Sequence, residues 1–299
     1  MTIRRRDFLM TAAAAVGLAA CAENRVQTAT AITAVDCHAH VFVRGLKLAN
    51  ERRYAPDYDA SIADYLAMLD ANGSSHGVLV QPSFLGTDNS YMLQALALAP
   101  QRLRGIAVVD PDIAVADLQA MDKAGIVGVR LNLIGKPDPD FALPVWQSHL
   151  RRLADLGWQV EIQAEAHRFP RLLPPLAAVG VTVVIDHMGL ADKTLGVDDP
   201  AFRWLLEQGA AARSSGRLFS KLSGAYRNGP GVAAKAAPLL VDAFGPLRLV
   251  WGSDWPHTAF EKVANPAQAR RDLESWVPDS DARKSILATS AARLFRFTV

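Results

Sequence analysis

Cysteine is scarce in this chain. Only Cys21 and Cys37 occur among its 299 residues, and Cys21 lies in an N-terminal segment that we expect to be processed. No disulfide is therefore expected, and the fold must be held together by its hydrophobic core. Hydrophobic residues make up 50% of the chain, which is ample for one domain of the size of an α/β barrel.

Net charge is also low, at +2 for the whole chain. Arg4, Arg5, Arg6 and Asp7 all lie near the N-terminus, and without residues 1–20 the formal charge falls to zero. A balanced charge argues against nucleic-acid binding, which needs a basic surface. We expect a small molecule as the partner and no nucleic acid.

The N-terminal apolar stretch is too short to cross a bilayer, which takes about 20 residues. Basic residues 4–6 precede an alanine-rich stretch over residues 11–20, a pattern typical of a secretory signal. Arg-Arg-x-Phe-Leu at residues 5–9 resembles a twin-arginine signal, whose pathway carries folded proteins. Leu-Ala-Ala-Cys at residues 18–21 resembles a lipoprotein cleavage box, which would leave Cys21 lipidated. The alternative is an ordinary signal in which Cys21 stands by chance.

These features predict three segments. Residues 1–20 are expected to form the signal, residues 21–33 a small, polar tether, and residues 34–299 a single folded domain. We expect the protein to be exported to the periplasm, where a lipid on Cys21 would be its one link to the membrane.

Short β-rich runs alternate with amphipathic stretches in the folded part. One stretch places Ile62, Tyr65 and Leu69 on a helical face, with Ser61 as N-cap and Gly73 beyond the C-terminus. Eight such runs favour a closed parallel (β/α)8 barrel of the TIM type, an α/β fold. A doubly wound sheet is the alternative, but it would need a glycine-rich turn after the first strand. The runs are 34–37, 77–81, 105–110, 127–133, 159–163, 181–186, 218–222 and 247–252.

The first run ends in an unusual polar segment, Asp36-Cys37-His38-Ala39-His40. In a parallel barrel the active site forms at the C-terminal ends of the strands. Because side chains alternate along a strand, we expect Asp36, His38 and His40 to point into the barrel mouth and Cys37 and Ala39 toward the helices. Two histidines so spaced can converge on one metal ion or one substrate oxygen.

The fourth run places an arginine toward the barrel interior. Alternation predicts Gly128, Arg130 and Asn132 on one face, and Val127, Val129 and Leu131 on the other. A buried guanidinium needs an anion. Two partners stay open at this point: the carboxylate of Glu161 on the fifth run, or a carboxylate of the substrate.

Two further polar residues follow the sixth and eighth runs. We expect His187 to extend the face formed by Val183 and Ile185. Asp254 follows the last run, where it would lie opposite the two histidines of the first. A single carboxylate in that position is well placed to take a proton from water.

Five segments together resemble the amidohydrolase superfamily. They are Asp-x-His-x-His, Gly-Val-Arg-Leu-Asn, Asp-His-Met-Gly, Lys-Leu-Ser-Gly-x-Tyr-Arg and Trp-Gly-Ser-Asp-Trp-Pro-His. The resemblance runs from about residue 35 to residue 295, which is nearly the whole chain after the expected signal. Within the superfamily they are similar to the lactonase group that includes 2-pyrone-4,6-dicarboxylate lactonase, 4-sulfomuconolactone hydrolase and sugar-acid lactonases. Residues 81–89 and Arg53-Tyr54 also resemble the dicarboxylate lactonase.

The resemblance implies a hydrolase that opens a lactone ring of an anionic small molecule. It implies that Asp254 is the general base and that His38, His40 and His187 bind or polarise the lactone carbonyl. Arg130, Tyr54, Ser83 and Arg227 are implied to hold the carboxylates of the substrate, and Asn132, Gln163 and Tyr226 are further candidates for substrate binding. The chain departs from the dicarboxylate lactonase after the fourth strand, where Lys136 is the one residue that offers a further positive charge.

Two readings of the metal content stay open. Many superfamily members use a carboxylate from the fourth strand and a histidine from the fifth, whereas this chain has Arg130 and Gln163 on those strands, so a binuclear centre is not expected. One divalent, zinc-like ion could be held by His38, His40, His187 and Asp254. Without an ion, imidazoles and arginine could stabilise the oxyanion, and the resemblance favours this second reading.

Two other functions compete with lactone hydrolysis. A metal-dependent decarboxylase of the same superfamily would also need an arginine for a carboxylate, but the missing fifth-strand histidine argues against it. A non-catalytic exported lipoprotein that binds carboxylated ligands would not need a general base such as Asp254. Among lactones, the pyrone, muconolactone and sugar-acid classes all remain open.

Overall fold

The computed structural model describes residues 31–214, 216–229 and 231–298. The expected signal over residues 1–20, Cys21 and most of the expected tether lie outside the described residues. Within the described part of the chain, no helix combines the length and the apolar character needed to cross a membrane.

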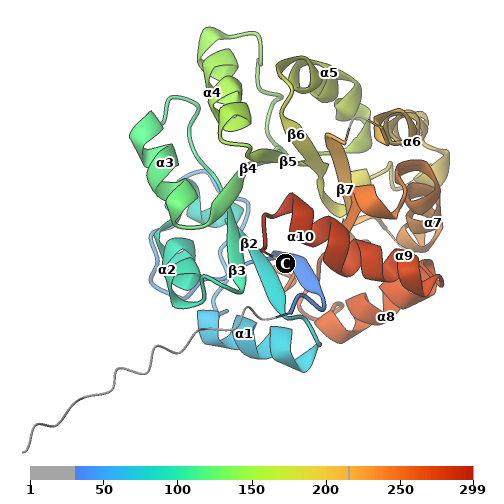
Figure 1. Cartoon of the computed structure of the whole chain (residues 1–299), viewed down its shortest axis with the longest axis horizontal. Helices are drawn as coiled ribbons and strands as arrows, with labels where there is room; N and C mark the ends of the chain where they lie inside the picture. Colours follow the sequence, from blue (N-terminus) through green and yellow to red (C-terminus); the bar gives the residue numbers. More distant parts are fainter. Residues whose placement is uncertain (1–30, 215, 230, 299) are drawn as a thin grey trace, which may run out of the picture.

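Eight parallel strands form one sheet in the order of the chain, and the helices surround them (Figure 1). A parallel bridge between Ala39 and Trp255 joins the first strand to the segment after the last and closes the barrel. The expected barrel is therefore confirmed, and the doubly wound sheet is excluded. The strands are β1 (Val35–Ala39), β2 (His76–Val80), β3 (Leu103–Ala107), β4 (Ile126–Asn132), β5 (Gln159–Gln163), β6 (Thr182–Ile185), β7 (Leu218–Leu222) and β8 (Leu249–Trp251).

The first helix begins and ends at the signals seen in the sequence. Ser61 caps α1 in a capping box with Asp64, and Gly73 follows the helix with a φ of 68°, which favours glycine. The helices are α1 (Ile62–Ala71), α2 (Ser90–Leu98), α3 (Val115–Lys123), α4 (Pro144–Asp155), α5 (Phe169–Val179), α6 (Pro200–Ala212), α7 (Val232–Phe244), α8 (Pro266–Trp276), α9 (Ser280–Lys284) and α10 (Ala291–Leu294).

The C-terminal segment covers one end of the barrel. Phe295 and Phe297 pack with Val35 and other inward residues of β1 to β4 and β8, and α10 crosses the barrel centre in Figure 1. The ring of Phe297 lies 4.8 Å, between centroids, from that of His76, the first residue of β2. This end is therefore the N-terminal end of the strands, and the C-terminal ends are left for a site.

The faces of β1 differ from the expectation. Asp36 pairs with Gly77, but Ala39 pairs with Leu79, so β1 carries one extra residue between them. Because of this bulge, Cys37 packs inside the barrel, whereas Asp36 accepts a hydrogen bond from Tyr65 of α1 at 3.4 Å. The expectation of an inward Asp36 and an outward Cys37 was wrong, since strict alternation fails at a bulge.

Two further predictions of side-chain direction, for Val127 and His187, were wrong. The pairing of β3 with β4 skips Val127, which packs inside the barrel, while Val129 packs in the cluster that includes the helices. Val183 and Ile185 belong to that same outer cluster. His187 therefore does not extend an inward face of β6, and it reaches the site through a turn in which its φ is 51°.

Candidate active site

The candidate site lies where the barrel closes, at the C-terminal ends of β1 and β8. The Asp254 amide donates to the His38 carbonyl and the His40 amide to the Trp255 carbonyl, both at 2.8 Å. Asp36 ties the same segments together, because its carboxylate accepts from the Ser253 amide at 2.7 Å and from the Ser253 hydroxyl at 2.6 Å. Burial outweighs these bonds and raises the pKa of Asp36 to about 6. These contacts hold Asp254 beside the two histidines.

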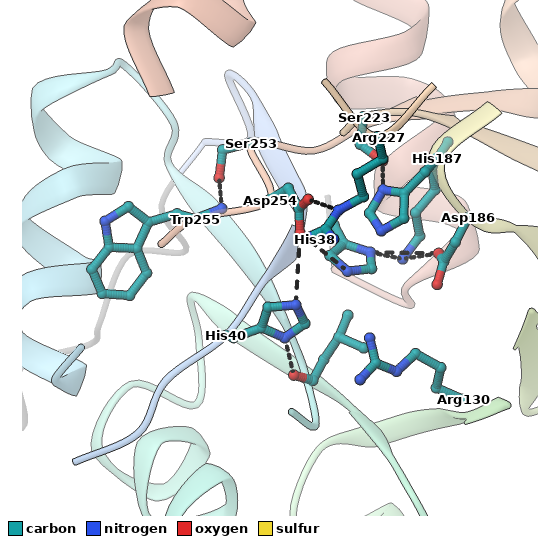
Figure 2. Close-up of polar contacts among 12 residues, drawn as sticks. His38, His40, Arg130, Asp186, His187, Ser223, Arg227, Ser253, Asp254 and Trp255 are labelled. Carbon is teal, nitrogen blue, oxygen red and sulfur yellow. Dashed lines mark hydrogen bonds and ion pairs between the residues drawn. The ribbon is translucent and has the colours of Figure 1, made fainter. Parts of the chain in front are cut away.

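Asp254 is the centre of the site (Figure 2). Its Oδ2 accepts from the Tyr226 hydroxyl at 2.5 Å and from Arg227 Nε at 2.7 Å. Its Oδ1 has no hydrogen-bond partner among the described residues and lies 3.8 Å from His38 Nε2 and 3.7 Å from His40 Nε2. Burial alone would raise the pKa of Asp254, but Arg227 and the histidines outweigh it and hold that pKa well below its usual range. The site thus contains an ionised carboxylate with one fixed and one free oxygen.

The three candidate histidines surround this carboxylate. His40 Nδ1 lies 2.7 Å from the Val80 carbonyl, which only accepts, so Nδ1 donates and Nε2 keeps its lone pair. His187 Nδ1 contacts the Ser223 hydroxyl at 3.0 Å, and burial lowers the His187 pKa to about 4. A Cβ on Gly224 would lie 2.6 Å from His187 Nδ1, so the imidazole needs glycine there. Burial also lowers the pKa values of His38 and His40, and all three rings are neutral near pH 7.

Sequence reasoning missed a buried ion cluster beside His38, made of Lys221, Glu161 and Asp186. Lys221 Nζ lies 2.6 Å from Glu161 Oε2, 3.3 Å from Asp186 Oδ1 and 3.1 Å from His38 Nδ1. Burial raises the pKa of Glu161 to about 7 against the pull of Lys221. For Asp186, Lys221 and His38 outweigh burial and hold its pKa well below the usual range. Lys221, a charged residue within the otherwise uncharged β7 run, was the available signal.

Arg130 differs from Lys221 because no carboxylate in the described part of the chain forms an ion pair with it. Its side chain is buried, with 3% of the residue exposed, and one guanidinium nitrogen donates to the Gln81 carbonyl. Its Nε has no partner among the described residues. Glu161 is adjacent to Arg130 in the β4–β5 register but pairs with Lys221. Glu161, the internal anion considered for Arg130, is therefore paired with Lys221, and a substrate carboxylate remains open as the partner of Arg130.

The remaining candidates line two cavities at the mouth. Gln163 and Arg227 line one of about 610 Å³, and Ser83 and Asn132 line a smaller one of about 240 Å³ with Lys136. Both cavities are lined by Arg53 and Ile134. Tyr54 lies close enough to Arg130 and Arg227 to influence the pKa of each guanidinium. Arg227, which the resemblance implies binds a substrate carboxylate, donates a hydrogen bond to Asp254 in the free protein.

Within residues 31–214, 216–229 and 231–298, two clusters of side chains offer ligand atoms for a metal ion: His38, His40 and Asp254, and His38, Asp186 and His187. Each cluster already borders a fixed cation. Lys221 lies 3.1 Å from His38 Nδ1 in the second cluster, and Arg227 lies 2.7 Å from the Asp254 carboxylate in the first. Since like charges repel at short range in a buried site, these residues fit a divalent ion poorly.

A barrel with histidines and one carboxylate at its strand ends is the architecture of a hydrolase of the amidohydrolase type. The chain matches the model of the amidohydrolase family over residues 35–297, and it belongs to this family.

Proteins similar to this chain include two curated enzymes and a solved structure. The chain is 36% identical to 2-pyrone-4,6-dicarboxylate hydrolase of Comamonas testosteroni, covering 88% of this chain and 90% of that protein. It is 30% identical to 4-sulfomuconolactone hydrolase of Hydrogenophaga intermedia, covering 87% and 88%. A structure from Acinetobacter baumannii, described as a probable 2-pyrone-4,6-dicarboxylic acid hydrolase with citric acid bound, is 38% identical with a TM-score of 0.84, covering 89% and 100%.

Proposed function

We propose that this protein hydrolyses the lactone ring of a small molecule that carries at least one carboxylate. The observation that carries the proposal is the free Oδ1 of Asp254, which lies within 4 Å of two imidazole nitrogens at the barrel mouth. The family relatives named for hydrolysis of a pyrone dicarboxylate and of a sulfomuconolactone support it.

A substrate carboxylate is proposed to bind Arg130. This guanidinium is buried and lacks an anionic partner in the described protein, and an unpaired buried charge is costly. A carboxylate of the ligand would supply the missing charge, and Tyr54 lies near enough to contribute a hydroxyl. Binding would orient the ring so that its carbonyl meets the histidines.

Asp254 is proposed to activate the attacking water. A water between its free Oδ1 and His40 Nε2 could donate one proton to each, which directs an oxygen lone pair at the lactone carbonyl. As the water attacks, Asp254 takes its proton and a new C–O bond forms. The ring C–O bond then breaks, and the leaving oxygen takes up the proton from Asp254, which gives an alcohol or enol and a carboxylic acid. The acid then loses the second proton of the water to solvent and becomes a carboxylate.

The negative charge that develops on the carbonyl oxygen is proposed to be stabilised by His38 and His187. Donors that are already in place at a buried site stabilise such charge strongly. Arg227 is bonded to Asp254 in the free enzyme. A second anionic group of the substrate would compete for Arg227, which would raise the basicity of Asp254 when substrate is bound.

A lactone panel tests the proposal. The purified enzyme is offered pyrone dicarboxylate, muconolactone and sugar-acid lactones, each beside its neutral methyl ester, and proton release is followed. We expect at least one free acid to be hydrolysed, with kcat/KM for its ester lower by roughly 30-fold or more, since a buried charge pair contributes about 2 kcal/mol or more. Release of carbon dioxide would instead indicate a decarboxylase, and binding without turnover a carboxylate-binding protein.

We also propose that the protein is exported and anchored through Cys21. The basis is the Arg-Arg-x-Phe-Leu segment and the Leu-Ala-Ala-Cys segment of the sequence. In a bacterial host with a twin-arginine pathway, replacing Arg5 and Arg6 by lysine should retain the protein in the cytoplasm. Cys21→Ser should abolish incorporation of labelled palmitate, and labelling that survives this change would contradict the anchor.

A further inference from the structure

Lys221 is not used in the mechanism above, yet it lies in the barrel interior with no exposed side-chain surface. Its Nζ donates to Glu161 Oε2 at 2.6 Å and lies 3.3 Å from Asp186 Oδ1. The third neighbour is Nδ1 of His38, at 3.1 Å. Two carboxylates at these distances keep the amine in its ammonium form.

The contact with Lys221 determines where His38 carries its proton. An ammonium group has only N–H bonds and no lone pair, so it can only donate. A proton on His38 Nδ1 would point at another N–H across 3.1 Å. The contact with Lys221 therefore favours an accepting Nδ1, which leaves the single proton of the neutral ring on Nε2.

His38 Nε2 faces the barrel mouth. It makes no hydrogen bond to any described residue and lies 3.8 Å from Asp254 Oδ1. His40, whose ring centroid is 5.1 Å from that of His38, donates through Nδ1 to the Val80 carbonyl. The two neighbouring imidazoles thus present opposite groups to the mouth, an N–H from His38 and a lone pair from His40.

We propose that Lys221 is a positioning residue that fixes the Nε2–H tautomer of His38 and so makes His38 the donor to the lactone carbonyl. The role in catalysis rests on the proposed function, whereas the tautomer is a property of the free enzyme. The competing arrangement has the proton on Nδ1, donated to Asp186 Oδ1 at 3.4 Å. It would leave two acceptors and no donor from His38 and His40 in the mouth.

Nitrogen NMR of the full chain labelled with ¹⁵N-histidine measures the tautomer directly. The His38 signals are assigned by their absence in His38→Gln. We expect a protonated Nε2 and an unprotonated Nδ1 in the free wild-type enzyme at neutral pH. A proton on Nδ1, or on both nitrogens, would overturn the proposal whether or not any lactone is hydrolysed.

A pair of variants tests the role of Lys221. The double variant Lys221→Met with Glu161→Gln removes the ammonium together with one carboxylate, so that less unpaired charge is buried. Its matched control, Glu161→Gln, keeps the contact between Lys221 and His38. We expect the double variant to move the His38 proton to Nδ1, and the control to keep it on Nε2.

Kinetics with 2-pyrone-4,6-dicarboxylate as the probe separate positioning from binding. The double variant should lose roughly 10- to 100-fold in kcat relative to the control, with little change in KM. This is the range seen when a side chain that orients a metal-bound histidine is removed. A double variant that keeps the Nε2–H tautomer and the kcat of the control would refute the assignment. If the double variant does not fold, the wild-type tautomer still decides.

Discussion

Two buried regions meet at His38, and they differ in whether their charged side chains are paired with opposite charges. On the interior side, the ion cluster of Lys221, Glu161 and Asp186 places one ammonium between two carboxylates. On the mouth side, no carboxylate of the described residues pairs with Arg130, and one oxygen of Asp254 accepts no hydrogen bond from them. Both regions are shielded from water, so the difference does not come from exposure.

The contrast suggests two roles for buried charge. The ion cluster stabilises the fold around the site, whereas Arg130 and Asp254 are available to interact with a ligand. Removing one member of a buried ion pair destabilises the protein, because the other member is left as a buried charge without an opposite charge beside it. A buried ion such as Arg130 has no opposite charge paired with it among the described residues of the free protein, and a charged substrate can supply one. We therefore expect substitutions in the ion cluster to affect folding and, through the His38 tautomer, kcat, and substitutions in the mouth to affect both substrate binding and turnover.

The largest effect is expected from Asp254→Asn. The amide keeps the shape of the side chain but cannot take a proton from water, so kcat should fall by roughly 10²- to 10⁴-fold. Binding of pyrone dicarboxylate, measured by calorimetry, should change little because Arg130 is intact. A variant with wild-type kcat would show that the free oxygen of Asp254 is not the base.

The next largest effect is expected on stability. The free energy of unfolding in urea is compared between Lys221→Met and Arg130→Met. Lys221→Met should lower the free energy of unfolding by about 3–5 kcal/mol, since it leaves two buried carboxylates unpaired. Arg130→Met should leave stability unchanged or higher, and should weaken carboxylate binding by about 2–5 kcal/mol. Equal losses of stability in the two variants would remove the distinction between the regions.

The dependence of kcat/KM on pH should be determined by the titratable groups at the barrel mouth, above all His187. Burial lowers the His187 pKa to about 4, so the neutral ring is lost only as the pH falls through that value. We expect kcat/KM to decrease near pH 4 as His187 becomes protonated, and His187 to contribute no step at the ordinary histidine value of about 6.5. A step near pH 6 would report protonation of Asp36, whose pKa is raised to about 6 and whose carboxylate holds Ser253 beside β1. Glu161, with a pKa raised to about 7 by burial, lies in the ion cluster away from the substrate. A step near pH 7 would show that its charge reaches the reaction.

The smallest effect is expected from metal removal. Lys221 and Arg227 already border both sets of potential ligands, and like charges disfavour a divalent ion beside them. Dialysis against a chelator should leave kcat within about twofold of its starting value, and zinc should not restore or raise it. Loss of activity on chelation, recovered with zinc, would make His38, His40 and Asp254 metal ligands.

The sequence predicted those features that depend on local pattern. The barrel, the cap at Ser61 and the convergence of His38, His40 and Asp254 follow from strand ends and helix signals that can be located along the chain. The roles given to these residues stay predictions. The predicted side-chain directions of Asp36 and Cys37 were wrong, because a bulge depends on how β1 pairs with β2.

Features that need several distant strands could not be read from the sequence. Lys221 meets Glu161 from β5 and Asp186 after β6 only once the barrel closes. His187 enters the site through a left-handed turn rather than through strand alternation. The partner of Arg130 stayed open for the same reason, since pairing with Glu161 depended on whether Lys221 competed for it.

The most direct test of the central claim, that Asp254 activates water, is a single turnover in H₂¹⁸O with enzyme in excess over lactone. General-base catalysis predicts one ¹⁸O atom in the newly formed carboxylate and no change in the mass of the enzyme. An unlabelled product, with ¹⁸O appearing in Asp254 instead, would show that the carboxylate attacks the carbonyl itself and would contradict the account.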